Sequence, residues 1–212
     1  MTFHKTYANI FLRLDKIKKE TKTMSGETTQ PAPSEVPVNG AFEIFDGKRE
    51  ELITLTRNGQ LLTKGDVVPA IPGILLEGRP FVLHTVNAFG TETCDACTDE
   101  VEAFHITHPE VPVYSLTKQS SEEIAAEDAK RNEEGRSRIT HQRVTVSNDT
   151  AINLGIALAP GEGADKEFWP TALRRTLALV DAGGRIVDIQ QPDDQEEVPD
   201  ITGIYEGVEN IK

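Results

Sequence analysis

The residues of this chain best suited to chemistry are its two cysteines, Cys94 and Cys97, which two residues separate. An apolar run, residues 81–88, leads into Gly90 and Thr91, and a helical pattern follows around the thiols. The N–H groups of a first helical turn have no partner within the helix, so a thiolate placed there is stabilised. Such placement is one route to a reactive sulfur. The second thiol lies one helical turn away, close enough for a disulfide. The pair therefore predicts thiol redox chemistry.

A zinc site is the main alternative use of two closely spaced cysteines, and it needs two more Cys or His ligands. His105 and His108 have the spacing HxxH, but Phe104 and Pro109 beside them favour an ordinary helix end. We therefore expect no metal ion and no other cofactor.

The composition narrows the classes of protein further. The 212 residues are enough for one domain, and 35 acidic against 22 basic residues give a net charge of −13. That charge disfavours nucleic acid and anionic membrane surfaces as partners, because both would repel it. No apolar run is long enough to span a bilayer. Two cysteines are too few for a disulfide scaffold, and CxxC in a reducing compartment indicates a redox pair, so we expect a cytoplasmic protein.

The first 40 residues give no functional signal. Arg13 and Asp15 interrupt the apolar positions of residues 1–23, so we expect no secretory h-region in this segment. The codons AAG GAG can encode Lys19-Glu20, and this nucleotide sequence is a ribosome-binding sequence just upstream of Met24. We therefore interpret Met24 as the true start of translation. The alternative is that residues 1–23 form a short amphipathic helix. Residues 25–40 are rich in Ser, Thr, Pro and Gly and predict a flexible arm. We expect an arm over 1–40 and a folded domain over 41–212.

From residue 41 the pattern alternates between strands and helices. Short strands are expected over 42–45, 51–56 and 60–62, separated by the hairpin dipeptides Asp46-Gly47 and Asn58-Gly59. Further along, the expected elements are a buried strand over 80–88, a helix over 91–105, a strand over 111–116, a helix over 120–134 with a capping box at its start, a strand over 143–147, a mixed segment over 151–159, a hairpin over 174–189 and a helix over 201–211. This order predicts an α/β thioredoxin-like fold, with a central mixed sheet flanked by helices and an N-terminal β-hairpin extension.

Several motifs give the chain a resemblance to the bacterial thiol peroxidases, a class of atypical two-cysteine peroxiredoxins in the thioredoxin superfamily. The resemblance runs from about Phe42 to the C-terminus. Residues 45–48 and 62–70 look like the family's first hairpin and its "vGdxaP" segment. Residues 91–98, Thr-Glu-Thr-Cys-Asp-Ala-Cys-Thr, look like its "TxxCDxxT" turn, and residues 175–184 look like its "RxxxxxDxxG" hairpin.

The resemblance implies that Cys94 is the peroxidatic cysteine and that Thr91 and Arg175 lie beside it. Arginine would keep the thiolate charged and donate hydrogen bonds to the peroxide oxygens, where negative charge grows. The Thr91 hydroxyl could accept a hydrogen bond from peroxide while donating to sulfur. The product would be a sulfenic acid, which a second thiol condenses to a disulfide.

The chain departs from the family at two places. Where the family has a proline seven residues before the peroxidatic cysteine, this chain has Asn87. The family's distant resolving cysteine is also missing, which leaves Cys97 as the one possible intramolecular resolver and implies a divergent CxxC site.

Simpler interpretations exist for individual residues. Thr91 could serve only as a helix cap, and Arg175 could be a surface arginine beside Arg174. The acidic residues after Cys94 (Asp95, Asp99, Glu100 and Glu102) would raise a nearby thiol pKa, or they could form a solvated helix face. His84 is expected to be a hydrogen-bonded histidine inside the sheet, with tuning of Cys94 as an alternative.

The leading hypothesis is a cytoplasmic antioxidant enzyme that reduces hydrogen peroxide or alkyl hydroperoxides. Its redox-active disulfide would be recycled by a thioredoxin-type reductant, and the resemblance implies a homodimer. Two alternatives stay open: a CxxC thiol–disulfide oxidoreductase, and a redox-sensing protein without peroxidase turnover.

Overall fold

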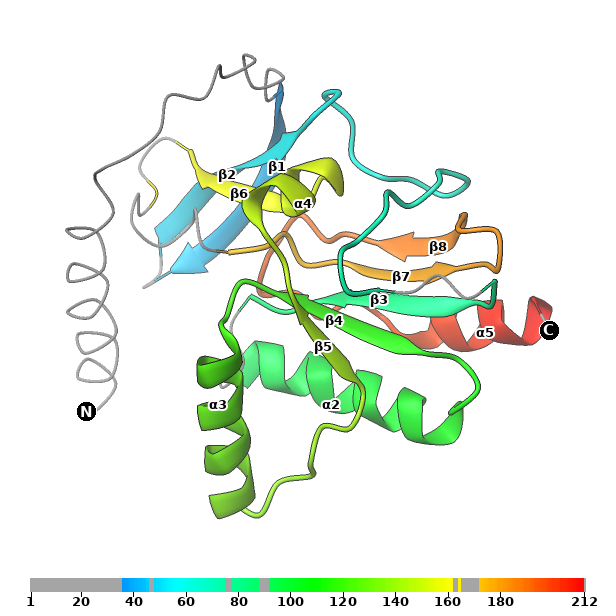
Figure 1. Ribbon diagram of the computed structural model, residues 1–212. Coiled ribbons are helices and arrows are strands. Elements are labelled where there is room, and N and C mark those ends of the chain that lie inside the picture. The colour runs from blue at the N-terminus through cyan, green and yellow to red at the C-terminus, as the bar shows by residue number, and fades with distance from the viewer. Residues whose placement is uncertain are drawn as a thin grey trace, which may run out of the picture. The chain divides into compact units, whose positions relative to one another are not determined.

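The computed structural model describes residues 36–45, 48–74, 78–87, 92–161, 164 and 172–211, and these residues form two sheets and four helices. The larger sheet has five strands in the order β5-β4-β3-β7-β8 (Figure 1). Its strands are β3 (Phe81–Thr85), β4 (Val113–Thr117), β5 (Gln142–Thr145), β7 (Leu177–Val180) and β8 (Ile186–Gln190). β3, β4 and β5 run parallel, whereas β7 is antiparallel to both β3 and β8. The sheet is therefore mixed, as the sequence predicted.

Helices follow the parallel strands in the expected order. α2 (Glu92–Thr107) connects β3 to β4, and α3 (Ser121–Glu133) connects β4 to β5. The remaining two are α4 (Asn148–Asn153) and α5 (Thr202–Asn210). The predicted capping box is present at the start of α3, where the Ser120 hydroxyl accepts from the Glu123 N–H and the Glu123 carboxylate accepts from the Ser120 N–H.

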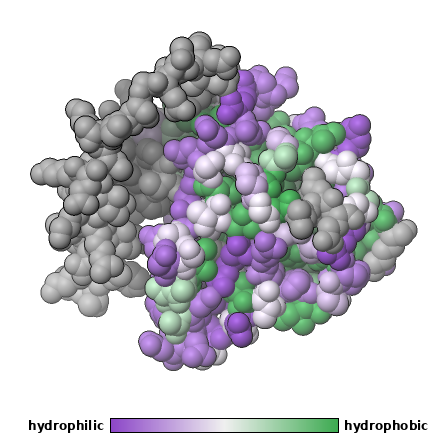
Figure 2. All heavy atoms as spheres, in the orientation of Figure 1, coloured by the Kyte–Doolittle hydropathy of each residue, from purple (hydrophilic) through white to green (hydrophobic). Residues whose placement is uncertain are grey.

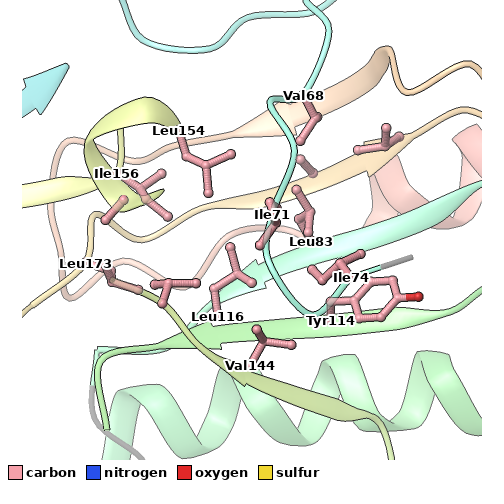
Figure 3. Packing of buried hydrophobic residues seen from close by; sticks show 14 of the residues in the cluster. Val68, Ile71, Ile74, Leu83, Tyr114, Leu116, Val144, Leu154, Ile156 and Leu173 are labelled. Atoms are coloured by element: carbon pink, nitrogen blue, oxygen red, sulfur yellow. The ribbon is translucent and has the colours of Figure 1, made fainter. Parts of the chain in front are cut away.

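Both faces of the central sheet are buried. Because successive side chains of a strand point to opposite faces, β3 contributes Val82 to one core and Phe81 and Leu83 to the other. The first core packs α2 and α5 against the sheet through residues such as Val101, Phe104, Ile204 and Val208. On the opposite face, the connection between β2 and β3 contributes Val68, Ile71 and Ile74 (Figure 3). This explains why residues 81–88 form a nearly continuous apolar run in the sequence.

The smaller sheet has the order β1-β2-β6. β1 (Val36–Phe45) and β2 (Lys48–Thr56) form an antiparallel pair whose register places Phe45 opposite Lys48, and the predicted hairpin dipeptide Asp46-Gly47 lies outside the described residues. β1 begins at Val36, inside the segment expected to be an arm. β6 (Ala157–Pro160) pairs with the other edge of β2.

The expectation of a strand over 60–62 and of a hairpin at Asn58-Gly59 is wrong. Residues 60–62 form no strand, and the edge of β2 that they would pair with is taken by β6, from more than 90 residues further along the chain. Gly59 does adopt a positive φ of 74°, and its N–H donates to the Thr56 hydroxyl, so the turn chemistry is local to the end of β2.

The described surface mixes polar and apolar residues on the face shown in Figure 2. None of the described helices combines the length and the apolar character that crossing a bilayer requires.

Candidate active site

Cys94 lies in the first turn of α2, where the sequence placed it, and its side chain is buried against Val86 and Ile139. The Thr98 hydroxyl donates to the Cys94 carbonyl oxygen at 2.7 Å, which fixes the backbone of this turn. Thr91, the other residue expected at the site, lies outside the described residues. The position of Cys94 at a helix start exposes its thiolate to the unpaired N–H groups of the helix.

Arg175 lies just before β7 and points its guanidinium at the first thiol. Its Nη2 donates to Cys94 Sγ at 3.7 Å, and only 4% of the residue is exposed. The alternative interpretation of Arg175 as a surface arginine is therefore wrong. A cation held in a buried site attracts a thiolate more strongly than one in water, because the surroundings screen it less.

Gln195 holds Arg175 in place, and sequence reasoning missed it. The Gln195 side-chain oxygen accepts from the Arg175 backbone N–H at 2.7 Å, and the Gln195 carbonyl accepts from Arg175 Nε at 2.8 Å. The Gln195 amide nitrogen donates in turn to the carbonyls of Pro192 and Asp193. A glutamine in a polar loop gives no signal in the sequence, because its partner lies 20 residues away across a fold contact.

The neighbouring Arg174 is just as buried but serves the other sheet. Its guanidinium donates to the Thr54 hydroxyl on β2 at 3.2 Å and to the Asp193 carboxylate at 2.7 Å. The two adjacent arginines therefore divide their roles, and only Arg175 reaches the thiols.

Asn87 has a structural contact at the position where the resembled family has proline. Its side-chain oxygen accepts from the Leu173 N–H at 2.8 Å and so ties the end of β3 to the segment before β7. That segment carries Arg175, so Asn87 helps to hold the arginine near Cys94.

Cys97 is buried one turn further along α2. Burial raises the pKa of the Cys97 thiol from 9.0 to about 12, although the nearby Arg175 charge opposes the shift. His84 Nε2 lies 3.1 Å from Cys97 Sγ. His84 is thus a buried, hydrogen-bonded histidine of the sheet as expected, and the thiol that it contacts is Cys97.

The alternative interpretation of the four acidic residues as a solvated helix face is wrong for two of them, Asp95 and Glu102. Asp95 is 6% exposed and pairs with Arg131 and Arg136, which also bind Asp99, so the start of α2 is bound to α3 and the residues after it. Glu102 is buried too, and its partners are described below. Because Asp95 is paired with two arginines, its charge is largely neutralised next to Cys94.

Within the described ranges, no three or more His, Cys, Asp and Glu side chains are grouped so that they could hold a metal ion. The chemistry that this arrangement supports is that of a thiol next to a fixed cation, with a second thiol one helical turn away.

Comparison with solved structures identifies the fold. A peroxiredoxin-like protein from Aquifex aeolicus superposes with a TM-score of 0.62 at 14% sequence identity, over 84% of this chain and 99% of that one. A thiol peroxidase from Chromobacterium violaceum gives 0.58 at 13% identity, over 80% and 96% of the two chains. The peroxidoxin BcpB from Mycobacterium tuberculosis gives 0.52 at 17% identity, over 71% and 99%.

By sequence, neither a protein-family model nor a curated protein matches this chain. At these identities the structural likeness shows the fold alone. The chain thus has the thioredoxin-like fold that peroxiredoxins share, which confirms the predicted fold class.

Proposed function

We propose that this chain, which has the fold of the peroxiredoxins, is a thiol peroxidase that reduces hydrogen peroxide or alkyl hydroperoxides through Cys94. The observation that carries the proposal is the contact between the Cys94 sulfur and the buried Arg175 guanidinium at 3.7 Å. The fold supports it, because solved proteins described as peroxiredoxin-like and as a thiol peroxidase share the overall fold of this chain.

In the first step the Cys94 thiolate attacks one peroxide oxygen. An S–O bond forms, the O–O bond breaks, and the other oxygen leaves as water or an alcohol after taking a proton. Negative charge moves from sulfur to the departing oxygen, and Arg175 has N–H groups to donate at both ends of that path. Thr91 would supply a further hydroxyl at the peroxide, as the sequence motif implies.

In the second step Cys97 would act as the resolving thiol. Its sulfur attacks the sulfenic sulfur of Cys94, the S–O bond breaks, and a disulfide and water result. A thioredoxin-type dithiol would then reduce the disulfide by two electrons and become a disulfide itself. Cytoplasmic location stays a prediction from the cysteine usage, and dimer formation stays a prediction from the resemblance.

Burial of Cys94 favours peroxide over a protein disulfide as the first substrate. In the reduced form, with both cysteines free, only 3% of Cys94 is exposed, so a disulfide carried by another protein has little room to reach its sulfur; the thioredoxin-type reductant would act on the oxidised form instead. Hydrogen peroxide is close to water in size and needs far less space. For this reason disulfide exchange ranks below peroxide reduction as the function of the pair.

The test is rapid mixing of the reduced protein with hydrogen peroxide and with cumene hydroperoxide, followed by mass spectrometry. We expect oxidation far faster than that of free cysteine, ending in a Cys94–Cys97 disulfide in the parent and a sulfenic acid in Cys97→Ser. Cys94→Ser is the matched control and should lose the fast oxidation. Oxidation of the parent at the rate of free cysteine would refute the peroxidase, and mixed disulfides trapped by Cys97→Ser would favour an oxidoreductase instead.

A further inference from the structure

A continuous chain of buried hydrogen bonds starts at Cys97. His84 Nε2 lies 3.1 Å from Cys97 Sγ, and His84 Nδ1 lies 2.9 Å from Ser115 Oγ. Ser115 Oγ lies 2.8 Å from His141 Nε2, and His141 Nδ1 lies 2.6 Å from Glu102 Oε2. Each of these five residues is at most 4% exposed. We call this set the Cys97–Glu102 relay.

The relay lies between α2 and the central sheet. Both of its ends, Cys97 and Glu102, are on α2, and its middle comes from β3 and β4, where His84 and Ser115 are register partners in the parallel pair. His141 directly precedes β5. The relay therefore leaves the helix at the second thiol, crosses two strands and returns to the helix at a carboxylate.

When Glu102 is ionised, every hydrogen bond of the relay is donated in the direction from Cys97 toward Glu102. A carboxylate only accepts, so His141 Nδ1 must carry the proton and His141 Nε2 accepts from Ser115. The Ser115 oxygen then accepts from His84 Nδ1–H, which leaves His84 Nε2 to accept the Cys97 S–H. Shifting one proton along each bond reverses every donor and gives a Cys97 thiolate and a neutral Glu102.

The surroundings of Glu102 favour the first of these two arrangements at rest. The backbone N–H of Thr140 donates to Glu102 Oε1 at 3.0 Å, its hydroxyl donates to the same oxygen, and the His141 N–H donates to Oε2 at 3.3 Å. Burial opposes ionisation, but these hydrogen bonds prevail and lower the pKa of Glu102. The anionic end of the relay is thus stable, and the Cys97 thiol holds its proton until it reacts.

A surface groove lies next to the carboxylate end of the relay. The groove, of about 610 Å³, is lined by residues that include Ser121, Arg138, Thr140 and His141. Thr140 and His141 are the two residues that bind the Glu102 carboxylate, so a proton on Glu102 is one hydrogen-bonded residue away from the groove.

We propose that the Cys97–Glu102 relay takes the Cys97 proton as that thiol attacks oxidised Cys94, with His84 as its general base and Glu102 as the final acceptor. This inference rests on the proposed role of Cys97 as the resolving thiol. As the S–S bond forms and the S–O bond of Cys94 breaks, the Cys97 proton passes to His84 Nε2 and one proton arrives at Glu102. The sulfenic oxygen leaves as hydroxide, and the proton that Glu102 releases by way of the groove neutralises it, so the net products are the disulfide and water.

Cys97 needs such assistance because of its burial. With a pKa of about 12, only about one molecule in 10⁵ carries the thiolate at neutral pH. His84 cannot store the proton, since burial, together with the nearby Arg175 charge, holds its pKa well below the usual value. The His84 ring stays neutral if it accepts a proton on one nitrogen while it donates a proton from the other. A general base positioned in this way raises the rate of a reaction by about 10²–10⁴-fold.

Removal of one hydroxyl from the relay tests the proposal. Excess 4,4′-dithiodipyridine is the probe, because it is a disulfide far smaller than one carried by a protein. Its reaction, followed by absorbance, first converts Cys94 to a mixed disulfide, and Cys97 then displaces the second thiopyridone. We expect Ser115→Ala to slow the second phase at least about tenfold and leave the first unchanged. Thr117→Val is the matched control, because Thr117 is equally buried on β4 but its hydroxyl accepts from the Gln119 N–H. Ser115→Thr, which restores the hydroxyl, should recover the second phase.

The imidazole ¹⁵N spectrum of the reduced parent chain supplies a second readout that needs no variant. The relay requires both His84 and His141 to carry their proton on Nδ1, whereas a free imidazole prefers Nε2. Protonation of either ring on Nε2, or equal slowing by Ser115→Ala and Thr117→Val, would overturn the proposal. The second phase uses no peroxide, so a parent that fails to consume peroxide refutes the peroxidase while the relay is still decided by these measurements.

Discussion

Replacing Arg175 with lysine is the most direct probe of the contact on which the proposed function depends. Lysine keeps the positive charge but loses the planar donor geometry, including the Nη2 contact to Cys94 Sγ and the Nε contact to the Gln195 carbonyl. A hydrogen bond to a charged group contributes about 1.5–3 kcal/mol. If that contribution stabilises the thiolate and the departing oxygen, oxidation of Cys94 slows about 10- to 150-fold.

The assay is the rapid-mixing oxidation of Cys94 by hydrogen peroxide, for Arg175→Lys beside Arg174→Lys. The two arginines are adjacent in sequence and similarly buried, but Arg174 donates to Thr54 and Asp193 and does not reach a thiol. Both variants remove a buried guanidinium, so loss of stability alone would affect them alike, and urea denaturation of each measures that loss. We expect Arg174→Lys to oxidise at the parent rate. Equal rates in the two lysine variants would refute the role assigned to Arg175.

Two further predictions follow from the contacts of the site. Gln195→Ala removes the side-chain oxygen that accepts from the buried Arg175 backbone N–H. We expect the variant to lose about 1–3 kcal/mol of stability in urea denaturation, and Cys94 oxidation to slow about tenfold because the guanidinium shifts. An unchanged rate would show that the Gln195 side chain does not position Arg175. Burial lowers the pKa of His141 from 6.5 to about 4, so the native state binds its proton less tightly than the unfolded chain does. The contribution of neutral His141 to the free energy of unfolding is complete above pH 6.5. It is lost as the pH falls from 6.5 to about 4, and the loss amounts to about 3 kcal/mol. The pKa of His84 is also lowered by burial, so His84 acts in the same direction. Urea denaturation between about pH 7 and 5 should show this fall, with a shallower slope in His141→Gln, and a flat profile in the parent would contradict it.

The sequence was sufficient for features that depend on local pattern. The apolar run over 81–88 has the composition of a strand buried on both faces, and β3 is such a strand. The Ser120 and Glu123 pair fixes the start of α3 because both partners lie within one turn. The helix start at Cys94 likewise depends on neighbouring residues. In each case the residues that interact are a few positions apart, so their spacing alone carries the information.

Local pattern was misleading where a distant segment competed for the same position. Asn58-Gly59 has the composition of a hairpin turn, but β6 takes the sheet edge that a following strand would have used. Asp95 and Glu102 have the sequence signature of a solvated face, and arginines and a histidine from more than 30 residues away bury them as partners. The charge of a side chain indicates that, without partners, it would favour water. Whether the side chain is buried depends on the residues that pack over it.

The sequence by itself determined the order of strands and helices, the position of a thiol at a helix start and a second thiol one turn away. Tertiary structure decided what surrounds those thiols, and for Arg175 it was the resemblance to a family, not the local pattern, that pointed to the contact beforehand. The tertiary structure brings Arg175 to Cys94 across 81 residues, and it aligns His84 with Ser115 through the register of two parallel strands. It also completes the chain of hydrogen bonds that connects Cys97 to Glu102 through the sheet. These contacts depend on strand order and register, which the packing of the whole core sets, and no spacing within one segment encodes them.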